Sequence, residues 1–131
     1  MAQVAITYPA VTLTEMSGAF LKRVLEDVAD NLFHPDPYYQ QGGDMVRSSG
    51  LQYSISPLAA ADSRIDQLTL NGKPIDANKT YKVAGWASVQ QVEGEPIWDV
   101  VARWLKAQGR VQKVRANQPE VTGLQNNQGM V

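Results

Sequence analysis

The segment from Asp36 to Arg47, called the site loop below, gathers more side chains suited to binding than any other stretch of the sequence. Paired tyrosines offer flat faces with polar tips, and two adjacent glycines let backbone amides approach a ligand closely. A carboxylate and a guanidinium supply fixed charge of both signs. The residues concerned are Tyr38, Tyr39, Gly42, Gly43, Asp44 and Arg47. Because binding residues concentrate on loops, we interpret the segment as a binding loop; a tight turn whose tyrosines cover the core edge is the alternative.

The composition of the chain excludes several classes of protein. The chain has 131 residues, of which 44% are hydrophobic and 19% charged, as expected for one globular domain. A formal net charge of −1 provides no field that would recruit nucleic acid or an anionic membrane. Without cysteine the chain has no thiol nucleophile, disulfide or thiolate metal site. No apolar run reaches the length of a membrane span, and no signal peptide is visible at the start.

Groups for catalysis are sparse. His34 is the sole histidine, so a metal site is not expected, and its place before Pro35 suits a residue at a helix end. The sequence contains no nucleophile elbow, no phosphate-binding Gly-Lys-Ser/Thr loop and no zinc-protease helix motif. Asp27, Asp30 and Asp36 are interpreted as solubilising charges or helix-dipole partners. We therefore expect the chain alone to be inactive, with no catalytic residue and no metal ligand.

A long amphipathic helix must position the site loop. Residues 4–13 alternate loosely and predict one or two short strands, and Ser17 then suits a helix N-cap. An apolar stripe at three- and four-residue spacing follows, formed by Leu21, Val24, Leu25, Val28 and Leu32. The charged residues Lys22, Arg23, Glu26, Asp27 and Asp30 fall mainly on the opposite, solvent side. The prolines at 35 and 37 predict a helix end near residues 31–33.

Strand patterns dominate the rest of the chain. Residues 51–55 alternate as a half-buried strand, and residues 65–70 lead into Asn71-Gly72, which favours a type I′ turn to a short or edge return strand. Residues 81–86 form a further strand. A second helix is predicted from Pro96 to a C-cap at Gly109, with a buried stripe formed by Ile97, Val100, Val101, Trp104 and Leu105. We expect an α+β domain with a mainly antiparallel sheet and two principal helices over residues 1–115, and a polar tail over 116–131 that wraps the surface or is partly disordered.

Several stretches resemble the C-terminal domains of the SoxB family, within the 5′-nucleotidase C-terminal domain superfamily. They include Leu25 to Phe33, which continues through Asp36 to Arg47, and the initial Ala5-Ile6-Thr7-Tyr8-Pro9. Asn71-Gly72-Lys73-Pro74, Lys79 to Trp86 and Pro96 to Val101 also fit. The turn and the Tyr-Lys-Val-Ala part are shared with 5′-nucleotidases more widely. The site loop and the Ala84-Gly85-Trp86 stretch favour SoxB.

The resemblance implies a two-domain periplasmic parent, the thiosulfohydrolase of bacterial sulfur oxidation. Its N-terminal metallophosphoesterase-type domain would hold two metal ions, with manganese expected, and activate water. The present domain would close over that site and recognise a cysteine-S-sulfonate on the SoxYZ carrier, from which sulfate is released. Neither nucleic acid nor a membrane is expected as a partner. A substrate-binding domain of a true 5′-nucleotidase and a stand-alone interaction module are the alternatives.

The resemblance also selects the residues expected to face substrate or partner: Tyr8, Tyr38, Tyr39, Gly42, Gly43, Asp44, Arg47 and Trp86. Arg47 suits an anionic sulfonate, because a guanidinium donates two parallel hydrogen bonds. Alternatively, Arg47 pairs with Asp44 or another carboxylate and fixes the loop. Trp86 would pack against the carrier arm or belong to the core. The segment after Trp86 departs from the nucleotidase pattern, which argues against a nucleotide substrate.

Overall fold

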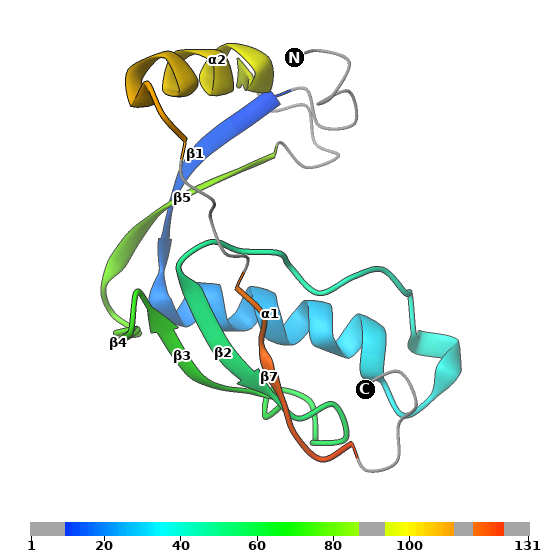
Figure 1. Cartoon of the computed structure of the whole chain (residues 1–131). Coiled ribbons are helices and arrows are strands. Elements are labelled where there is room, and N and C mark those ends of the chain that lie inside the picture. The colour runs from blue at the N-terminus through cyan, green and yellow to red at the C-terminus, as the bar shows by residue number, and fades with distance from the viewer. Residues whose placement is uncertain (1–9, 87–93, 112–116, 125–131) are drawn as a thin grey trace. The chain divides into compact units, whose positions relative to one another are not determined.

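A computed structural model describes residues 10–86, 94–111 and 117–124 (Figure 1). The chain divides into two compact units. Unit 1 comprises Met1–Met16 and Thr80–Val114, and unit 2 comprises Ser17–Lys79 and Arg115–Val131. The expected α+β class with two principal helices is confirmed, and the strands form two sheets. The predicted boundary between a domain over 1–115 and a tail over 116–131 stays a prediction.

Unit 2 is built on helix α1 (Gly18–Phe33), which begins and ends where the sequence predicts. The Ser17 side chain accepts the Phe20 amide at 3.1 Å, so the predicted N-cap is confirmed. The helix stops at His34, whose own N–H still donates to the Asp30 carbonyl at 3.0 Å. Pro35 follows, and its ring disfavours a helical conformation at His34.

A four-stranded sheet completes unit 2, with the order β4-β3-β2-β7. Strands β2 (Leu51–Ile55), β3 (Ile65–Leu70) and β4 (Lys73–Pro74) are antiparallel neighbours. Asn71 and Gly72 have φ of 50° and 77°, the two positive values that a type I′ turn needs. The return strand β4 is short and lies at the sheet edge, as predicted. The described part of the polar tail adds β7 (Glu120–Val121), which pairs with β2 in parallel.

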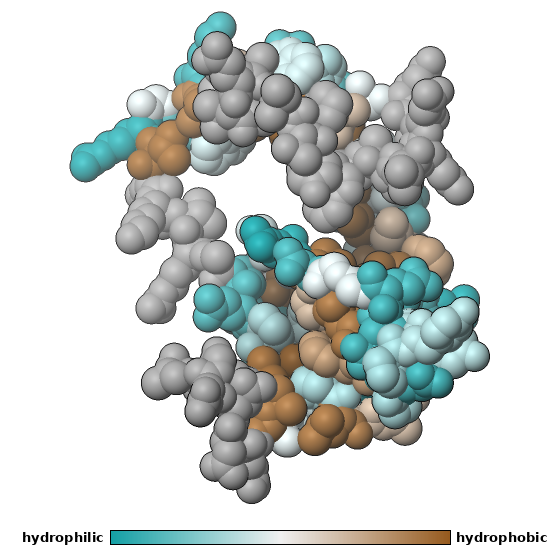
Figure 2. All heavy atoms as spheres, turned by 90° about the vertical axis from the view of Figure 1, so that its right-hand side faces the viewer, coloured by the Kyte–Doolittle hydropathy of each residue, from teal (hydrophilic) through white to brown (hydrophobic). Residues whose placement is uncertain are grey.

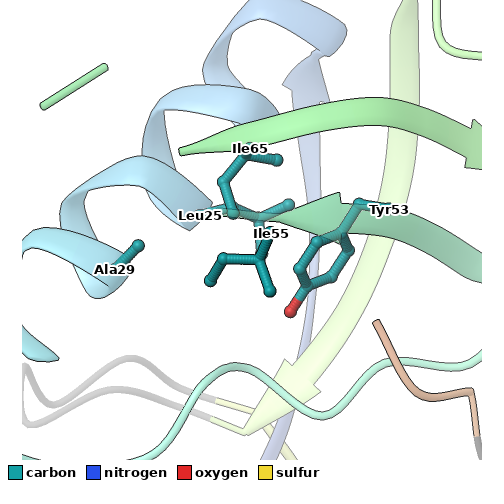
Figure 3. Packing of buried hydrophobic residues seen from close by; sticks show 5 residues of the cluster. All are labelled: Leu25, Ala29, Tyr53, Ile55 and Ile65. Atoms are coloured by element: carbon teal, nitrogen blue, oxygen red, sulfur yellow. The ribbon is translucent and has the colours of Figure 1, made fainter. Parts of the chain in front are cut away.

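The core of unit 2 lies between α1 and the sheet. Figure 3 shows its five buried apolar side chains: Leu25, Ala29, Tyr53, Ile55 and Ile65. The Tyr53 ring lies at one side of the cluster, next to Ile55. Its hydroxyl oxygen is buried and lacks a hydrogen-bond partner in the part of the chain that is described. Burial raises the pKa of the Tyr53 phenol, since the ionised form is the poorly solvated one.

One prediction about α1 is wrong. The charged residues of α1 were expected mainly on the side opposite its apolar stripe, but Glu26 is only 3% exposed. Its two carboxylate oxygens accept the backbone N–H groups of Arg64 and Ile65, at 3.1 and 2.8 Å. Asp30 pairs with the guanidinium of Arg64 at 2.7 Å. These two carboxylates therefore hold the start of β3 against the helix, and they are not simply solubilising charges.

Unit 1 contains a three-stranded sheet and the second helix. The sheet has the order β5-β1-β6, from β5 (Thr80–Trp86), β1 (Ala10–Ser17) and β6 (Glu95–Pro96). Strand β1 starts in unit 1 and runs to the N-cap of α1. It pairs with β6 in antiparallel register, Ala10 opposite Pro96.

The second prediction to correct concerns helix α2 (Ile97–Gln108). It ends at Gly109 as predicted, and Pro96 occupies its N-cap. Its apolar stripe was expected to be buried, yet α2 has no buried residue: Trp104 is 46% and Leu105 37% exposed. Heptad-like spacing identifies one apolar face of a helix, but it does not say what covers that face.

Candidate functional site

The site loop starts at the C-terminal end of α1 and is tied there by several hydrogen bonds. The Asp36 amide donates to His34 Nδ1 at 3.1 Å, and the Gln40 side-chain amide donates to the His34 carbonyl at 2.7 Å. Asp36 also accepts the Tyr38 amide at 2.9 Å and so caps the short 3-10 helix η1 (Pro37–Tyr39). His34 therefore organises the loop at the helix end, as its position before a proline suggests.

The two tyrosines of η1 lie on the surface. Tyr38 is 88% and Tyr39 59% exposed. Their rings meet edge to face, with centroids 5.5 Å apart, and the Tyr39 ring lies 5.0 Å from that of His34. Exposure of this degree is at odds with the alternative that the tyrosines cover the core edge. The row of three rings instead presents aromatic faces and phenol groups to whatever approaches.

The glycine pair is required by backbone conformation. Gly42 and Gly43 have φ of 78° and 105°, and an added Cβ at either position would meet nothing within 4 Å. A side chain would therefore fit in space but would be strained by the backbone. The Gly42 N–H donates to the carbonyl of Asn31 at 3.2 Å, which returns the loop to the last turn of α1. The backbone at Gly43 is left open on its outer side.

Asp44 and Arg47 form an ion pair with 3.3 Å between Oδ2 and Nη2. The alternative in which Arg47 pairs with a nearby carboxylate is thus the arrangement seen in the structure. Both side chains are highly exposed, at 80% and 90%. Ion pairs of this kind contribute about 0–1 kcal/mol, so an incoming anion can replace Asp44 at little cost.

Two predicted residues are not placed by the structure. Tyr8 lies outside the described residues, and Trp86 ends strand β5 with its side chain undescribed. The other six candidates lie in the site loop, where the structure pairs Tyr38 with Tyr39 and Asp44 with Arg47. On the face that Figure 2 turns toward the viewer, hydrophilic side chains gather beside apolar ones.

The sequence alone missed Arg64, which contacts the end of α1 from which the site loop starts. Its guanidinium is 2% exposed and donates through Nη2 to the carbonyl of Phe33, the last residue of α1, at 3.4 Å. A single arginine after a polar turn carries no pattern that distinguishes a buried residue from a solvated one. Only its proximity to Asp30, which is 34 residues away in sequence, would have given a signal.

Two searches of the described residues found nothing. Those residues include no group of three or more histidine, cysteine, aspartate or glutamate residues able to hold a metal ion. They also include no helix long and apolar enough to cross a membrane. The site loop presents aromatic rings, open backbone and one paired arginine, groups that are suited to binding a ligand.

Comparisons with known proteins identify the family of this chain. The sequence matches the family described as 5′-nucleotidase, C-terminal domain, over residues 3–103. A search of curated proteins finds no significant match. Among solved structures, the chain is similar to a Thermus thermophilus sulfate thiohydrolase, SoxB, solved in complex with glycerol, with 37% identity over 92% of this chain and a TM-score of 0.73.

A second solved structure extends the likeness of fold. It is a Staphylococcus aureus protein described as a 5′-nucleotidase, in complex with α-ketoglutarate, with 14% identity over 87% of this chain and a TM-score of 0.58. The present chain spans 24% of the SoxB chain and 27% of the nucleotidase chain, about a quarter of each. At 14% identity the second likeness shows the fold alone. The chain belongs to the 5′-nucleotidase C-terminal domain family, and within it the resemblance is to the SoxB type.

Proposed function

We propose that this chain is the substrate- and partner-recognition domain of a SoxB-type dimetal hydrolase that acts in thiosulfate oxidation in the periplasm. The observation that carries the proposal is the exposed site loop, in a chain 37% identical to SoxB. The partners would be an N-terminal metallophosphoesterase-type domain of the same parent and the SoxYZ carrier. Two metal ions, with manganese proposed, would be held by that N-terminal domain and would activate the attacking water.

The chemistry of the proposed substrate matches the loop. A cysteine-S-sulfonate carries a negative charge on three oxygens at the end of a peptide side chain. Water attacks the sulfonate sulfur, the sulfur–sulfur bond breaks, and the products are a carrier thiol and hydrogen sulfate. Arg47 is proposed to leave Asp44 and donate two hydrogen bonds to the sulfonate oxygens. Tyr38 and Tyr39 would pack against the arm, and the open backbone at Gly43 would let the arm approach closely.

The two other predicted contacts remain part of the proposal. Tyr8 and Trp86 are proposed to line the same substrate channel, Trp86 by packing against the carrier arm. Their test is the same as for the loop residues: replacement by phenylalanine should weaken peptide binding while leaving the chain folded.

A nucleotide is the second candidate ligand. The exposed ring of Tyr38 is free to stack on a base, an interaction worth about 1–3 kcal/mol per base in proteins that bind nucleic acids. The family to which the chain belongs takes its description from 5′-nucleotidases. A stand-alone interaction module, in contrast, has no observation in its favour.

An NMR titration distinguishes these functions. The probes are a short peptide with one cysteine-S-sulfonate, the same peptide with a free thiol, and AMP. We expect amide shifts confined to residues 36–47 and 86 with the sulfonate peptide, and none with the thiol peptide. The Arg47→Gln variant should weaken the peptide affinity roughly tenfold, whereas Arg23→Gln, at an exposed position on α1, should not change it.

Other outcomes would revise the function. Shifts with AMP and not with the peptide would assign the domain to a nucleotidase. Shifts with neither probe would show that the loop does not itself recognise the sulfonate. Equal effects of Arg47→Gln and Arg23→Gln would remove the assigned role of Arg47.

A further inference from the structure

Arg64 is a buried arginine whose guanidinium donates to three acceptors in two segments, helix α1 and the loop after β2. It precedes β3, and its side chain is 2% exposed. Nε donates to the Pro57 carbonyl at 3.2 Å, Nη1 to Asp30 at 2.7 Å and Nη2 to the Phe33 carbonyl at 3.4 Å. Burying a charged group is costly unless partners replace water. The planar fork of arginine allows one residue to meet partners in three directions, which an ammonium group does not.

The backbone of Arg64 is fixed independently of its side chain. Glu26 is 3% exposed and accepts the N–H groups of Arg64 and Ile65 with its two oxygens. Glu26, Asp30 and Phe33 follow one another at intervals of four and three residues, so they lie on one face of α1. The backbone of Arg64 is thus held at Glu26, and its side chain extends along α1 to the C-terminal end of the helix.

The Phe33 carbonyl is where this buried contact meets the site loop. The last four carbonyls of a helix lack partners within the helix and must find them elsewhere. At the end of α1, the Asn31 carbonyl accepts the Gly42 amide of the site loop and the Phe33 carbonyl accepts Arg64. The peptide unit that begins with this carbonyl ends at the nitrogen of His34, the residue that organises the start of the loop. Its orientation therefore sets the direction in which the chain leaves the helix.

We propose that Arg64 is a positioning residue for the site loop: by holding the Phe33 carbonyl and the end of α1, it fixes the direction in which Tyr38, Tyr39 and Arg47 are presented. Arg64 itself does not contact the ligand, because it is buried. What the loop recognises rests on the proposed function; how Arg64 holds the loop does not. A purely structural ion pair would support the core and leave the loop unaffected, and the two roles are separable by experiment.

The principal test is Arg64→Lys in the 131-residue chain, without ligand. Lysine keeps the charge opposite Asp30 but cannot reach the Pro57 and Phe33 carbonyls at the same time. We expect amide shifts at residues 34–43 and hydrogen exchange at the Gly42 amide roughly fivefold to tenfold faster, while the amides of β2 and β3 beyond Ile65 keep their protection. The matched control is Arg23→Lys at an exposed position on the same helix, which should leave the loop amides unchanged.

A second variant keeps the test decisive if lysine at this position prevents folding. Asp30→Asn preserves side-chain shape and leaves the bond from Arg64 to the Phe33 carbonyl available. It should shift the loop amides in the same direction, by less than Arg64→Lys would. In a folded variant, unchanged loop amides would overturn the positioning role. Exchange accelerated uniformly across unit 2 would overturn it equally, since that is the result of lost core stability alone.

Ligand binding then adds a separate readout. With the cysteine-S-sulfonate peptide, Arg64→Lys should weaken affinity about threefold to tenfold, as expected for a loop that must be ordered on binding. If the loop amides shift but the peptide binds neither the unsubstituted 131-residue chain nor the variant, the positioning role stands and the proposed function fails. If the peptide binds the unsubstituted chain and the Arg64→Lys variant equally well, the positioning role fails and the proposed function stands.

Discussion

The two units of this chain stabilise their helices differently. In unit 2, α1 buries Leu25 and Ala29 against β2 and β3, and adds the buried carboxylate of Glu26. In unit 1, α2 has a comparable apolar periodicity, yet none of the described residues of that unit is buried. Similar patterns in the sequence thus have different energetic consequences. Among the described residues, the site loop therefore belongs to the unit that has a buried core.

The largest expected effect comes from making one substitution in both units. Leu25→Ala removes a side chain that is 3% exposed and should cost about 2–5 kcal/mol of the free energy of unfolding. Leu105→Ala removes the same atoms from a residue that is 37% exposed and should cost about 1 kcal/mol or less. Urea unfolding followed by circular dichroism measures both. Equal losses would break the comparison, because they would mean that the face of α2 is as fully packed as that of α1.

A smaller effect, of opposite sign, is expected at Tyr53. Its buried hydroxyl lacks a partner among the described residues, so Tyr53→Phe should stabilise the chain by about 1 kcal/mol. Because burial raises the pKa of this phenol above 10.0, the folded state keeps its proton where the unfolded chain loses it. Stability should therefore fall as the pH rises above that value.

The loss of stability at alkaline pH provides the control for the Tyr53→Phe variant. Thermal unfolding at a series of pH values should show that stability declines less steeply with rising pH for Tyr53→Phe than for the unsubstituted chain. A destabilised phenylalanine variant would instead mean that the hydroxyl has a partner, and the core of unit 2 would be less completely apolar than described.

The smallest effect is expected at the surface of unit 1. Arg103 donates through both terminal nitrogens to the two carboxylate oxygens of Glu95, which joins β6 to α2. The hydrogen bond from Arg103 and its positive charge hold the pKa of Glu95 below 4.5. A lowered pKa contributes stability that is present above the unfolded value and is lost as the pH falls through the folded value.

The Arg103→Gln variant tests this contribution. It should lose less stability than the parent chain between about pH 5 and pH 3, by an amount smaller than the change from Tyr53→Phe. Raising the salt concentration should reduce the difference, since both groups are exposed. A difference that persists in high salt would mean that the pair is shielded from water, and unit 1 would then be better packed at β6 than its exposure indicates.

Local sequence patterns predicted much of the fold. The cap at Ser17, the end of α1 before Pro35 and the turn at Asn71-Gly72 each follow from the chemistry of neighbouring residues. That Tyr38 and Tyr39 lie on an exposed loop also follows from local sequence, whereas their role in binding stays a prediction.

The remaining features depend on distant partners. Whether Glu26 is solvated or buried depends on the backbone of Arg64, which lies 38 residues away. Strand β7 comes from a polar segment without alternation, and it pairs with β2 through the backbone. The exposure of α2 depends on what covers it, and helical periodicity contains no information about that.

The division into two units has a consequence for optical measurements. All three tryptophans, Trp86, Trp98 and Trp104, lie in unit 1, whereas the aromatic residues of unit 2 are tyrosines, phenylalanines and the histidine. Intrinsic tryptophan fluorescence during unfolding therefore reports on unit 1, whereas circular dichroism reports on both units. Coincidence of the two curves would show a single cooperative transition. A fluorescence change that is complete while part of the ellipticity remains would show unit 1 melting first, with the site loop still held in place.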